Sequence, residues 1–414
     1  MLPMLRIPRM PETDATRPGA RDSPPLREGF TTGSAATGAA LAALTLLLRH
    51  AAPATVSVPL PPITPQAPGP AGTPGPELPR AWMDLPVAFC AHGPAPELAA
   101  LPHATPRALP GAHARVRKDG GDDPDATNGA LITATVFLRS PAAPPHDLRL
   151  EAGPGVGRAT LPGLPVAVGA PAINPGPRAQ LRFALRRALD DMAGEGAERP
   201  ALDVILSVPG GEELARHTLN PRLGITGGIS ILGTQGTVRP YSHAAWRAAV
   251  AQGLSVAAAT GCRAICLSTG RRSERLLMRR YPELPPQAFV QAADFARFSL
   301  AAAGALPLER LVWGCFFGKL AKLAQGLEYT HAREAPLDMA ALAALCREAG
   351  AACAPEISRA VTAAHALELL LADTAAPAAL AAVGARAAAT ARRFAGRPVT
   401  LHLFHTDGRE LLTV

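Results

Sequence analysis

The sequence predicts an α+β N-terminal domain followed by an α/β domain with a mostly parallel, helix-covered sheet. Three observations support this fold class. The chain has 414 residues, of which 48% are hydrophobic, so it can bury more than one core. Strand-like runs in the first half are separated by loops rich in Pro and Gly. In the second half, apolar strands alternate with glycine turns and helices, which is typical of a parallel sheet.

The first half contains two predicted helices and several short strands. Residues 1–25 are rich in Pro, Arg and Thr without periodicity and predict a disordered tail. Residues 34–49 have helical composition, with Thr31, Thr32 and Ser34 available as caps. The other predicted elements are strands at residues 55–59, 85–90, 130–138 and 148–152, a Pro-rich loop at residues 61–81, and a helix from residue 177 to about residue 192.

A Gly-, Glu- and Pro-rich linker, GEGAERP, predicts the domain boundary near residue 195. The two domains are therefore expected at residues 26–194 and 195–414. Beyond the linker, three runs each have the pattern of a strand, a turn and a helix: LDVILSVPGGEELARHTL, RAICLSTGRRSERLLMRR and RLVWGCFFGKLAKLAQGL. Helices rich in Ala and Leu are expected at residues 337–395, and strands at residues 399–404 and 410–414 would close the sheet edge.

Charge indicates the class of partner. The chain has 41 Lys and Arg residues against 33 Asp and Glu residues, a mild surplus for a nucleic-acid binder, and only 4% of residues are aromatic. We therefore expect a polyanionic small molecule, and no nucleic acid, as partner. Lysine, whose ammonium group is carried on a flexible side chain, is scarce: the only lysines are Lys118, Lys319 and Lys322.

Cysteine usage and hydropathy indicate the cellular compartment of the protein. The six cysteines are scattered, which indicates a reduced, cytoplasmic environment, and Cys262 and Cys266 have no second pair at zinc spacing, so no metal site is predicted. The longest apolar run, residues 35–48, is interrupted and shorter than the ~20 residues of a membrane span. We expect no membrane association, and the sequence leaves a homo-oligomer open.

Three glycine turns follow predicted strands in the second half, at residues 209–211, 268–271 and 314–319. In open α/β sheets, ligands bind outside the carboxyl ends of the strands, and the N–H groups of a helix N-terminus there suit a carboxylate or phosphate. Glycine can also be present in each turn only because the chain reverses direction there. An anion-binding site and a purely structural turn therefore both remain open.

Glycines interrupt an apolar pattern in NPRLGITGGISILGTQGTV, residues 220–238. Glycine weakens a strand unless another group must approach the backbone closely, and a bound cofactor would be such a group. A structural bulge is the alternative. The chain contains no GxGxxG fingerprint and no Walker A loop, so neither a dinucleotide nor a nucleoside triphosphate is indicated.

Carboxylates crowd beside cations in RVRKDGGDDPDATNG. Asp122, Asp123 and Asp125 lie close to Lys118 in sequence, so neighbouring charges could tune one carboxylate to handle a proton. A solvated Asp-Pro turn is the alternative. The loop is not an EF-hand, because the twelfth position counted from Asp119 is Ala130 and not a glutamate.

Two arginines and one histidine are weaker candidates. Arg178 and Arg222 follow Asn-Pro or Gly-Pro turns, where a guanidinium could clamp a carboxylate or lie solvated on the surface. His331 follows Tyr329 and Thr330 at the end of the third strand-turn-helix unit, where a capping or core role is the alternative.

Read together, these segments resemble the cobalt-precorrin-5B C(1)-methyltransferase family of cobalamin biosynthesis. The matches run in order over about residues 26 to 335: LREGFTTGSAATGAA, KDGGDDPDATNGA, GVGRATLPGLPVAVGAPAINPGPR, SVPGGEELARHTLNPRLGITGGISILGTQGTV, STGRRSE, ADFARFSL and GKLAKLAQGLEYTH. The resemblance implies a soluble, cytoplasmic enzyme that transfers a methyl group from S-adenosylmethionine to C1 of the corrinoid polycarboxylate cobalt-precorrin-5B, giving cobalt-precorrin-6A, with no protein-bound metal.

The resemblance also suggests roles for the candidate residues. Asp122, Asp123, Asp125 and His331 are candidates for proton transfer. The candidates for holding S-adenosylmethionine are Gly227, Gly228, Ser230, Gly233, Thr234 and Gly236. The candidates for binding the carboxylates of the ring are Thr31, Thr32, Lys118, Arg178, Arg222, Thr269, Gly270, Arg271, Lys319 and Lys322. We expect the glycine-lined strand ends of the second half and the Asp-rich loop of the first half to form one cleft.

The chain departs from the family pattern at several positions. Glu28, Phe30 and Ala35 stand where the family has threonine, tyrosine and often cysteine, so no thiol role is expected there. Ala332 and Arg333 follow His331 where the family has serine and an acidic residue. The alternative function is a non-catalytic tetrapyrrole-binding or channelling protein, which would have no need of S-adenosylmethionine.

Overall fold

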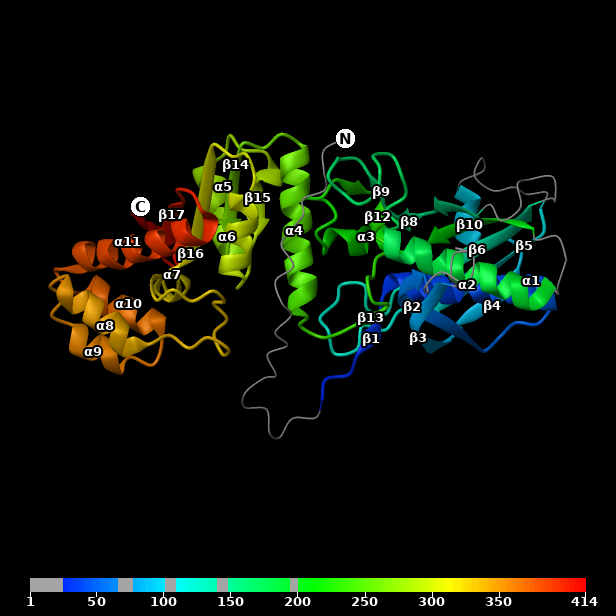
Figure 1. Ribbon diagram of the computed structural model, residues 1–414, viewed down its shortest axis with the longest axis horizontal. Helices are drawn as coiled ribbons and strands as arrows, with labels where there is room; N and C mark the ends of the chain where they lie inside the picture. Colours follow the sequence, from blue (N-terminus) through cyan, green and yellow to red (C-terminus); the bar gives the residue numbers. More distant parts are fainter. Residues whose placement is uncertain (1–24, 66–76, 101–108, 140–147, 194–199) are drawn as a thin grey trace, which may run out of the picture. The chain divides into compact units, whose positions relative to one another are not determined.

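The computed structural model forms two compact units that divide between Ser242 and His243 (Figure 1). It describes residues 25–65, 77–100, 109–139, 148–193 and 200–414. The predicted tail, residues 1–25, lies almost wholly outside the described residues. The predicted fold class is confirmed: an α+β unit precedes an α/β unit with a mostly parallel sheet.

The N-terminal unit is built on a five-stranded sheet of order β4-β5-β6-β10-β7, in which only the β10–β7 pair is parallel. Its strands are β4 (Phe89–His92), β5 (Gly111–Arg117), β6 (Leu131–Arg139), β7 (Leu148–Ala152) and β10 (Ala201–Ser207). β5 was not predicted, although Ala112, Ala114 and Val116 alternate with longer polar side chains and lie buried on one face.

Two long helices cover one face of this sheet. They are α1 (Thr32–Arg49), which packs on β5 and β6, and α2 (Pro175–Ala193), which packs beside α1. The short helix η2 (Pro96–Ala100) contributes Leu98 to the opposite face, where Phe137 and Ile205 are buried. By length and composition alone α1 could span a membrane, but 83% of it is buried inside the structure, as expected of a core helix.

The prediction of a Pro-rich loop over residues 61–81 is wrong at both ends. Strands β2 (Thr55–Pro65) and β3 (Glu77–Pro86) form an antiparallel hairpin, and residues 66–76 lie outside the described part. Prolines are tolerated because each strand has only one partner here, so half of its N–H groups need no acceptor in the sheet. The hairpin packs on α1 and α2.

The predicted boundary near residue 195 differs from the structure. β10, which was expected to open the C-terminal sheet, pairs with β6 over Ala201 to Ser207 and completes the N-terminal sheet. Its apolar residues fit a strand buried on both faces of any sheet, so the pattern could not identify the partner. The turn at residues 209–211 and α3 (Gly211–Arg216) therefore also belong to the N-terminal unit.

Short two-stranded ladders tie the rest of the N-terminal unit together. They pair β1 (Gly29–Phe30) with β13 (Thr237–Val238), β8 (Gly155–Val156) with β12 (Gly228–Ile229), and β9 (Arg158–Ala159) with β11 (Ile225–Thr226). The glycine-rich segment thus contributes three of these strands and is held by parts of the chain far away in sequence.

The C-terminal unit is built on a sheet of order β15-β14-β16-β17-β18, parallel except for β18. The strands are β14 (Ala264–Ser268), β15 (Phe289–Gln291), β16 (Arg310–Phe316), β17 (Thr400–Phe404) and β18 (Glu410–Thr413). The predicted strands at residues 399–404 and 410–414 are confirmed as β17 and β18, and β18 is the edge strand of the sheet.

Helices cover both faces of this sheet. On one face α5 (Arg271–Arg280) packs through Leu277 against Cys266 and Val312. On the other face Leu267 and Trp313 enter a larger core formed with the remaining helices: α4 (His243–Ala259), α6 (Ala296–Gly304), α7 (Phe317–Ala324), α8 (Met339–Glu348), α9 (Ala354–Arg359), α10 (Ala363–Leu371) and α11 (Ala376–Ala395). The short helix η3 (Pro286–Ala288) precedes β15.

Candidate active site

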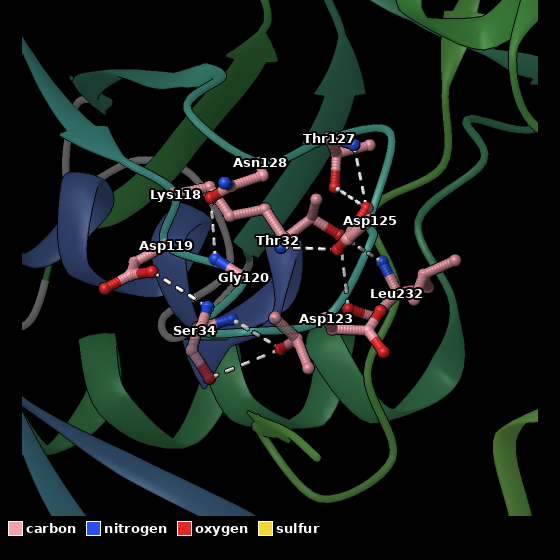
Figure 2. Close-up of polar contacts among 12 residues, drawn as sticks. Thr32, Ser34, Lys118, Asp119, Gly120, Asp123, Asp125, Thr127, Asn128 and Leu232 are labelled. Carbon is pink, nitrogen blue, oxygen red and sulfur yellow. Dashed lines mark hydrogen bonds and ion pairs between the residues drawn. The ribbon is translucent and has the colours of Figure 1, made fainter. Parts of the chain in front are cut away.

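The N-terminus of α1 is joined to the glycine-rich segment by hydrogen bonds (Figure 2). Thr31 is the N-cap and accepts from the backbone N–H of Ser34. The hydroxyl of Thr32 accepts from the N–H of Leu232 at 2.9 Å, and the hydroxyl of Ser34 donates to the carbonyl of Gly236 at 2.8 Å. Thr31 and Thr32, predicted as ligands of the substrate, are therefore buried inside the protein and are engaged there.

The Asp-rich loop lies against the same helix terminus. The N–H of Phe30 donates to the carbonyl of Asp119 at 2.8 Å, and Phe30 is in turn paired with Thr237 of β13. A Cβ added to Gly29 would lie 2.3 Å from the carbonyl oxygen of Asp119, so the two backbones approach as closely as glycine allows. The glycine-rich segment and the Asp-rich loop thus lie on either side of β1.

Lys118 and Asp125 form the charged centre of this loop. The Lys118 side chain is 2% exposed, and its Nζ lies 2.5 Å from Oδ2 of Asp125 (Figure 2). Oδ1 of Asp125 accepts from both the N–H and the hydroxyl of Thr127, each at 2.7 Å. Burial raises the pKa of the Asp125 carboxyl, but Lys118 and Thr127 outweigh it and hold the pKa below its usual value. Both oxygens of Asp125 are occupied, so the carboxylate organises the loop.

Asp122 and Asp123 each accept a backbone hydrogen bond. Asp122 is exposed and accepts from the N–H of Arg27 at 2.7 Å. Asp123 is half-buried, and its Oδ1 accepts from the N–H of Tyr241 at 2.9 Å. Tyr241 has a positive φ of 58°, which is rare for a bulky residue, and its side chain is 55% exposed. Asp123 therefore holds a strained, solvent-facing tyrosine at the end of the glycine-rich segment.

Most of the glycines predicted to hold the cofactor are explained by packing within the protein. A Cβ added to Gly228 would lie 2.1 Å from the backbone of Gly155. One added to Gly233 would lie 2.4 Å from the hydroxyl of Thr31, and one added to Gly236 would lie 2.7 Å from the side chain of Leu60. Only the Cβ of Gly227 would meet no atom of the described chain within 4 Å. The close approach inferred from the sequence is real, but the approaching group is the chain itself.

The other proposed cofactor and substrate residues of this unit divide between buried and exposed positions. The Ser230 hydroxyl is buried and donates to Asn220, whereas Thr234 is exposed. Arg178 braces the chain by donating to the carbonyls of Ile173 and Pro171, and burial lowers the pKa of its guanidinium. Arg222 is half-buried and also has an interaction partner within the protein.

The carboxyl edge of the C-terminal sheet holds the second group of candidates. The chain runs from β14 to β15 on one side and then returns across β14 to β16 on the other, so the strand order reverses between β14 and β16. Thr269, Gly270 and Arg271 follow β14, and Lys319 follows β16, so these candidates flank one switch point. That is where open α/β sheets bind their ligands.

Lys319 and Lys322 are held by the segment that follows α7. Lys319 forms an ion pair with Asp294 and donates to the carbonyl of Thr330 at 2.8 Å. Lys322, which is 7% exposed, donates to the carbonyls of Thr330 and His331 at 3.2 and 2.9 Å. Burial, with the charge of Lys319, lowers the pKa of Lys322. All three lysines singled out in the sequence therefore have internal partners.

His331 belongs to a cluster of aromatic and acidic side chains. Its ring stacks on Tyr329 with centroids 6.0 Å apart, and Nδ1 lies 3.7 Å from Oε1 of Glu334. The phenol of Tyr329 lies 3.1 Å from Nε2 of His243, at the start of α4. Burial, followed by Glu334 and Asp294, raises the pKa of Tyr329 to about 12, so the phenol stays protonated.

The described residues hold no cluster of metal ligands, and burial makes two of the thiols unreactive. No group of three His, Cys, Asp or Glu side chains in the part that the structure describes could hold a metal ion. Burial raises the pKa of Cys266 to about 12, as it does for Cys315, which leaves both thiols protonated and unreactive near neutrality.

Sequence reasoning did not single out Asp294, Ser268, His243 or Tyr241. Asp294 lies in the quoted motif ADFARFSL, just past a strand end, and that position was a usable signal. Ser268 was included only as the first residue of the predicted glycine turn at residues 268–271. Its complete burial, like the positive φ of Tyr241, depends on the tertiary structure.

The chain is similar in sequence to known proteins over most of its length. The sequence profile of the CbiD family matches residues 20–67 and 99–240, and that of the CbiD C-terminal domain matches residues 329–414. A Nitratidesulfovibrio vulgaris protein named cobalt-precorrin-5B C(1)-methyltransferase is 54% identical over 95% of this chain and 94% of its own length. A Salinispora arenicola protein of the same name is 42% identical over 98% and 95%. A crystal structure of a cobalamin biosynthesis protein (cbiD) from Archaeoglobus fulgidus is 27% identical, covers 71% of this chain and 78% of that one, and superposes with a TM-score of 0.33.

Proposed function

Since this chain belongs to the CbiD family, we propose that it is an S-adenosylmethionine-dependent methyltransferase that methylates C1 of cobalt-precorrin-5B to give cobalt-precorrin-6A. One observation carries the proposal: two relatives named for this activity are 54% and 42% identical over 95% and 98% of the chain. The predicted polyanionic partner agrees with it, since a corrinoid polycarboxylate suits a protein with a formal net charge of +8.

The site has to position its reactants more than activate them. S-adenosylmethionine supplies a methyl group that is already activated by its sulfonium. The chain must hold the ring carbon in line with that group, and such positioning contributes on the order of 7 to 11 kcal/mol to lowering a barrier. The exposed Arg271, at the start of α5, is suited to pair with a carboxylate, whereas Lys118, Lys319 and Lys322 orient loops through internal contacts.

Asp123 is the carboxylate that we propose as the proton acceptor. Asp125 has both oxygens occupied, and Asp122 is exposed to solvent. Asp123 is half-buried and uses Oδ1 to hold Tyr241. Replacing Asp123 by Asn keeps an acceptor for the Tyr241 N–H but removes the base. We expect Asp123→Asn to lower kcat by about 100-fold or more with unchanged thermal stability, the contribution typical of general base catalysis.

Asp122→Asn is the matched control, because it removes a neighbouring carboxylate that also accepts a backbone N–H. It is expected to keep kcat within a few-fold of wild type. Steady-state turnover and thermal unfolding of the two variants are measured side by side. Wild-type turnover in Asp123→Asn would remove the proton-acceptor role and leave Asp123 as the holder of Tyr241.

A labelling experiment tests the function itself. The purified protein is incubated with methyl-labelled S-adenosylmethionine and cobalt-precorrin-5B, and the macrocycle is analysed by mass spectrometry and NMR. We expect label at C1 and a product heavier by one methylene. Binding of the macrocycle without transfer of label would contradict the proposal and favour the non-catalytic tetrapyrrole carrier.

A further inference from the structure

We propose that S-adenosylmethionine binds in the C-terminal unit, at the carboxyl edge between β14 and β16, with its carboxylate on the N-terminus of α5. The identity of this ligand rests on the proposed function. The location differs from the glycine-rich segment that the sequence suggested, where Gly228, Gly233 and Gly236 are packed against the protein's own atoms.

The strand order provides the crevice. The chain leaves β14 toward β15 on one side and leaves β16 toward β17 on the other, so the connections that follow β14 and β16 diverge at their carboxyl ends. This divergence opens a crevice between the end of β14 and the end of β16 in sheets of this kind. Here Ser268, Thr269 and Gly270 lie on one side of it, and Phe316 and Lys319 lie on the other.

The N-terminus of α5 is free to receive an anion. Gly270 is its N-cap and provides no side-chain hydrogen bond, and the hydroxyl of Thr269 lies 3.4 Å from that of Ser273. The first N–H groups of a helix have no acceptor within the helix, so they attract a carboxylate. A Cβ on Gly270 would meet no atom of the described chain within 4 Å, and the neighbouring Arg271 is exposed and cationic.

A buried hydroxyl beneath this turn points to a ligand independently. Ser268 is 0% exposed, and its Oγ has no hydrogen-bond partner among the described residues. Strand residues alternate in direction, so Ser268 faces the same side as Cys266, which packs on Leu277 of α5. The hydroxyl therefore lies under the helix whose first turn follows it. Leaving such a group unpaired destabilises the fold, and a bound polar group would remove that penalty.

The end of β15 completes the site. Ala293 has a φ of +49°, a strained conformation for alanine of the kind that collects at ligand sites. It precedes Asp294, whose Oδ1 is fixed by Lys319 and by the hydroxyl of Thr330. An acidic side chain after the second strand is placed to accept hydrogen bonds from ribose hydroxyls. The three strand ends thus provide for the carboxylate and the ribose of one nucleoside-containing ligand.

Calorimetric titration of the full chain with S-adenosylhomocysteine and with 5′-methylthioadenosine tests the location. Methylthioadenosine keeps the nucleoside but lacks the carboxylate. In Gly270→Asp the new side chain caps α5 and occupies the N–H groups, and Asp is a favoured N-cap in extended backbone. We expect the affinity for S-adenosylhomocysteine to fall about 10- to 100-fold, the effect of one lost charged hydrogen bond, and that for methylthioadenosine to stay unchanged.

Matched variants control for folding. Gly210→Asp places the same side chain at the N-cap of α3, where the glycine also has open space but a left-handed φ of +74°, and should leave both affinities as in wild type. Ser268→Ala should weaken S-adenosylhomocysteine binding about tenfold. Ser299→Ala, which removes the other fully buried serine hydroxyl of this unit that lacks a partner in the described chain, should not.

The outcomes separate the location from the function. Wild-type affinity for S-adenosylhomocysteine in Gly270→Asp and Ser268→Ala would overturn the location while leaving the proposed methyl transfer intact. Failure of the wild-type protein to bind either nucleoside would overturn both. A third titration uses uroporphyrin, an octacarboxylate tetrapyrrole. If Gly270→Asp weakens uroporphyrin and not S-adenosylhomocysteine, the carboxylate at α5 belongs to the macrocycle and the inference is wrong.

Discussion

Replacing Gly228 by alanine is expected to destabilise the protein by about 3 kcal/mol or more, because the new Cβ would overlap backbone atoms of a paired strand. The built Cβ lies 2.1 Å from the carbonyl carbon and oxygen of Gly155, which is the ladder partner of Gly228. The φ of Gly228, +155°, adds strain for any side chain. Neither backbone can move away from the new Cβ without breaking the β8–β12 pairing, so the structure cannot relieve the overlap at a small cost in free energy.

Gly227→Ala is the matched control on the adjacent residue. Gly227 also has a positive φ, +81°, but its Cβ would meet nothing within 4 Å in the described chain. We expect it to cost only about 1 kcal/mol, the penalty of a left-handed conformation. Urea unfolding of the two variants measures the difference. Equal losses would mean that conformational strain alone, and not the contact with Gly155, explains the glycine at 228.

Gly227→Ala also bears on the donor site. Gly227 is the one glycine of the proposed cradle whose open side no described residue fills. If S-adenosylmethionine bound there, alanine would weaken its binding without unfolding the protein. Since we place the donor at α5, we expect Gly227→Ala to bind S-adenosylhomocysteine as tightly as wild type in the same calorimetric assay.

Replacing Lys118 by Met is expected to cost about 3 kcal/mol of unfolding free energy, because it leaves the partly buried Asp125 carboxylate without its cation. Lys118 is 2% exposed and Asp125 22% exposed, so water replaces the lost partner only in part. Arg117→Met is the control in the same loop. Arg117 is exposed and makes one contact at 3.1 Å to a carbonyl, so its loss should cost less than about 1 kcal/mol.

The pH dependence identifies the cause of that loss. The pKa of Asp125 is lowered in the folded protein, so the group contributes stability above its unfolded pKa of ~3.9, and this contribution is lost as pH falls through the folded pKa. We expect part of the fall in wild-type stability below about pH 4 to be absent in Lys118→Met. Parallel curves for the two proteins would show that lost packing, and not lost charge, explains the effect.

Local patterns in the sequence were sufficient for the elements that carry their own signal. Continuous apolar strands followed by glycine turns predicted β14 and β16 as buried parallel strands, since both faces of such a sheet are covered by helices. The Asp-rich segment was recognised as a turn with cations beside it, and the structure pairs Lys118 with Asp125 only seven positions along the chain. The missed elements include β5, whose small alanines gave weak alternation, and the Pro-containing hairpin. No element was predicted for α4, β15 or α6 either.

What the sequence alone determined is the fold class, the family and most of the elements, because periodicity, turns and motifs are properties of neighbouring residues. What only the tertiary structure decided is which groups meet. Thr32 binds Leu232, 200 positions away, and Lys319 binds Asp294 across two elements. It also decided that β10 joins the N-terminal sheet and that the glycines at 228 and 233 accommodate the chain itself. Such contacts depend on chain packing and strand register, and a local pattern is compatible with many partners until the fold selects one.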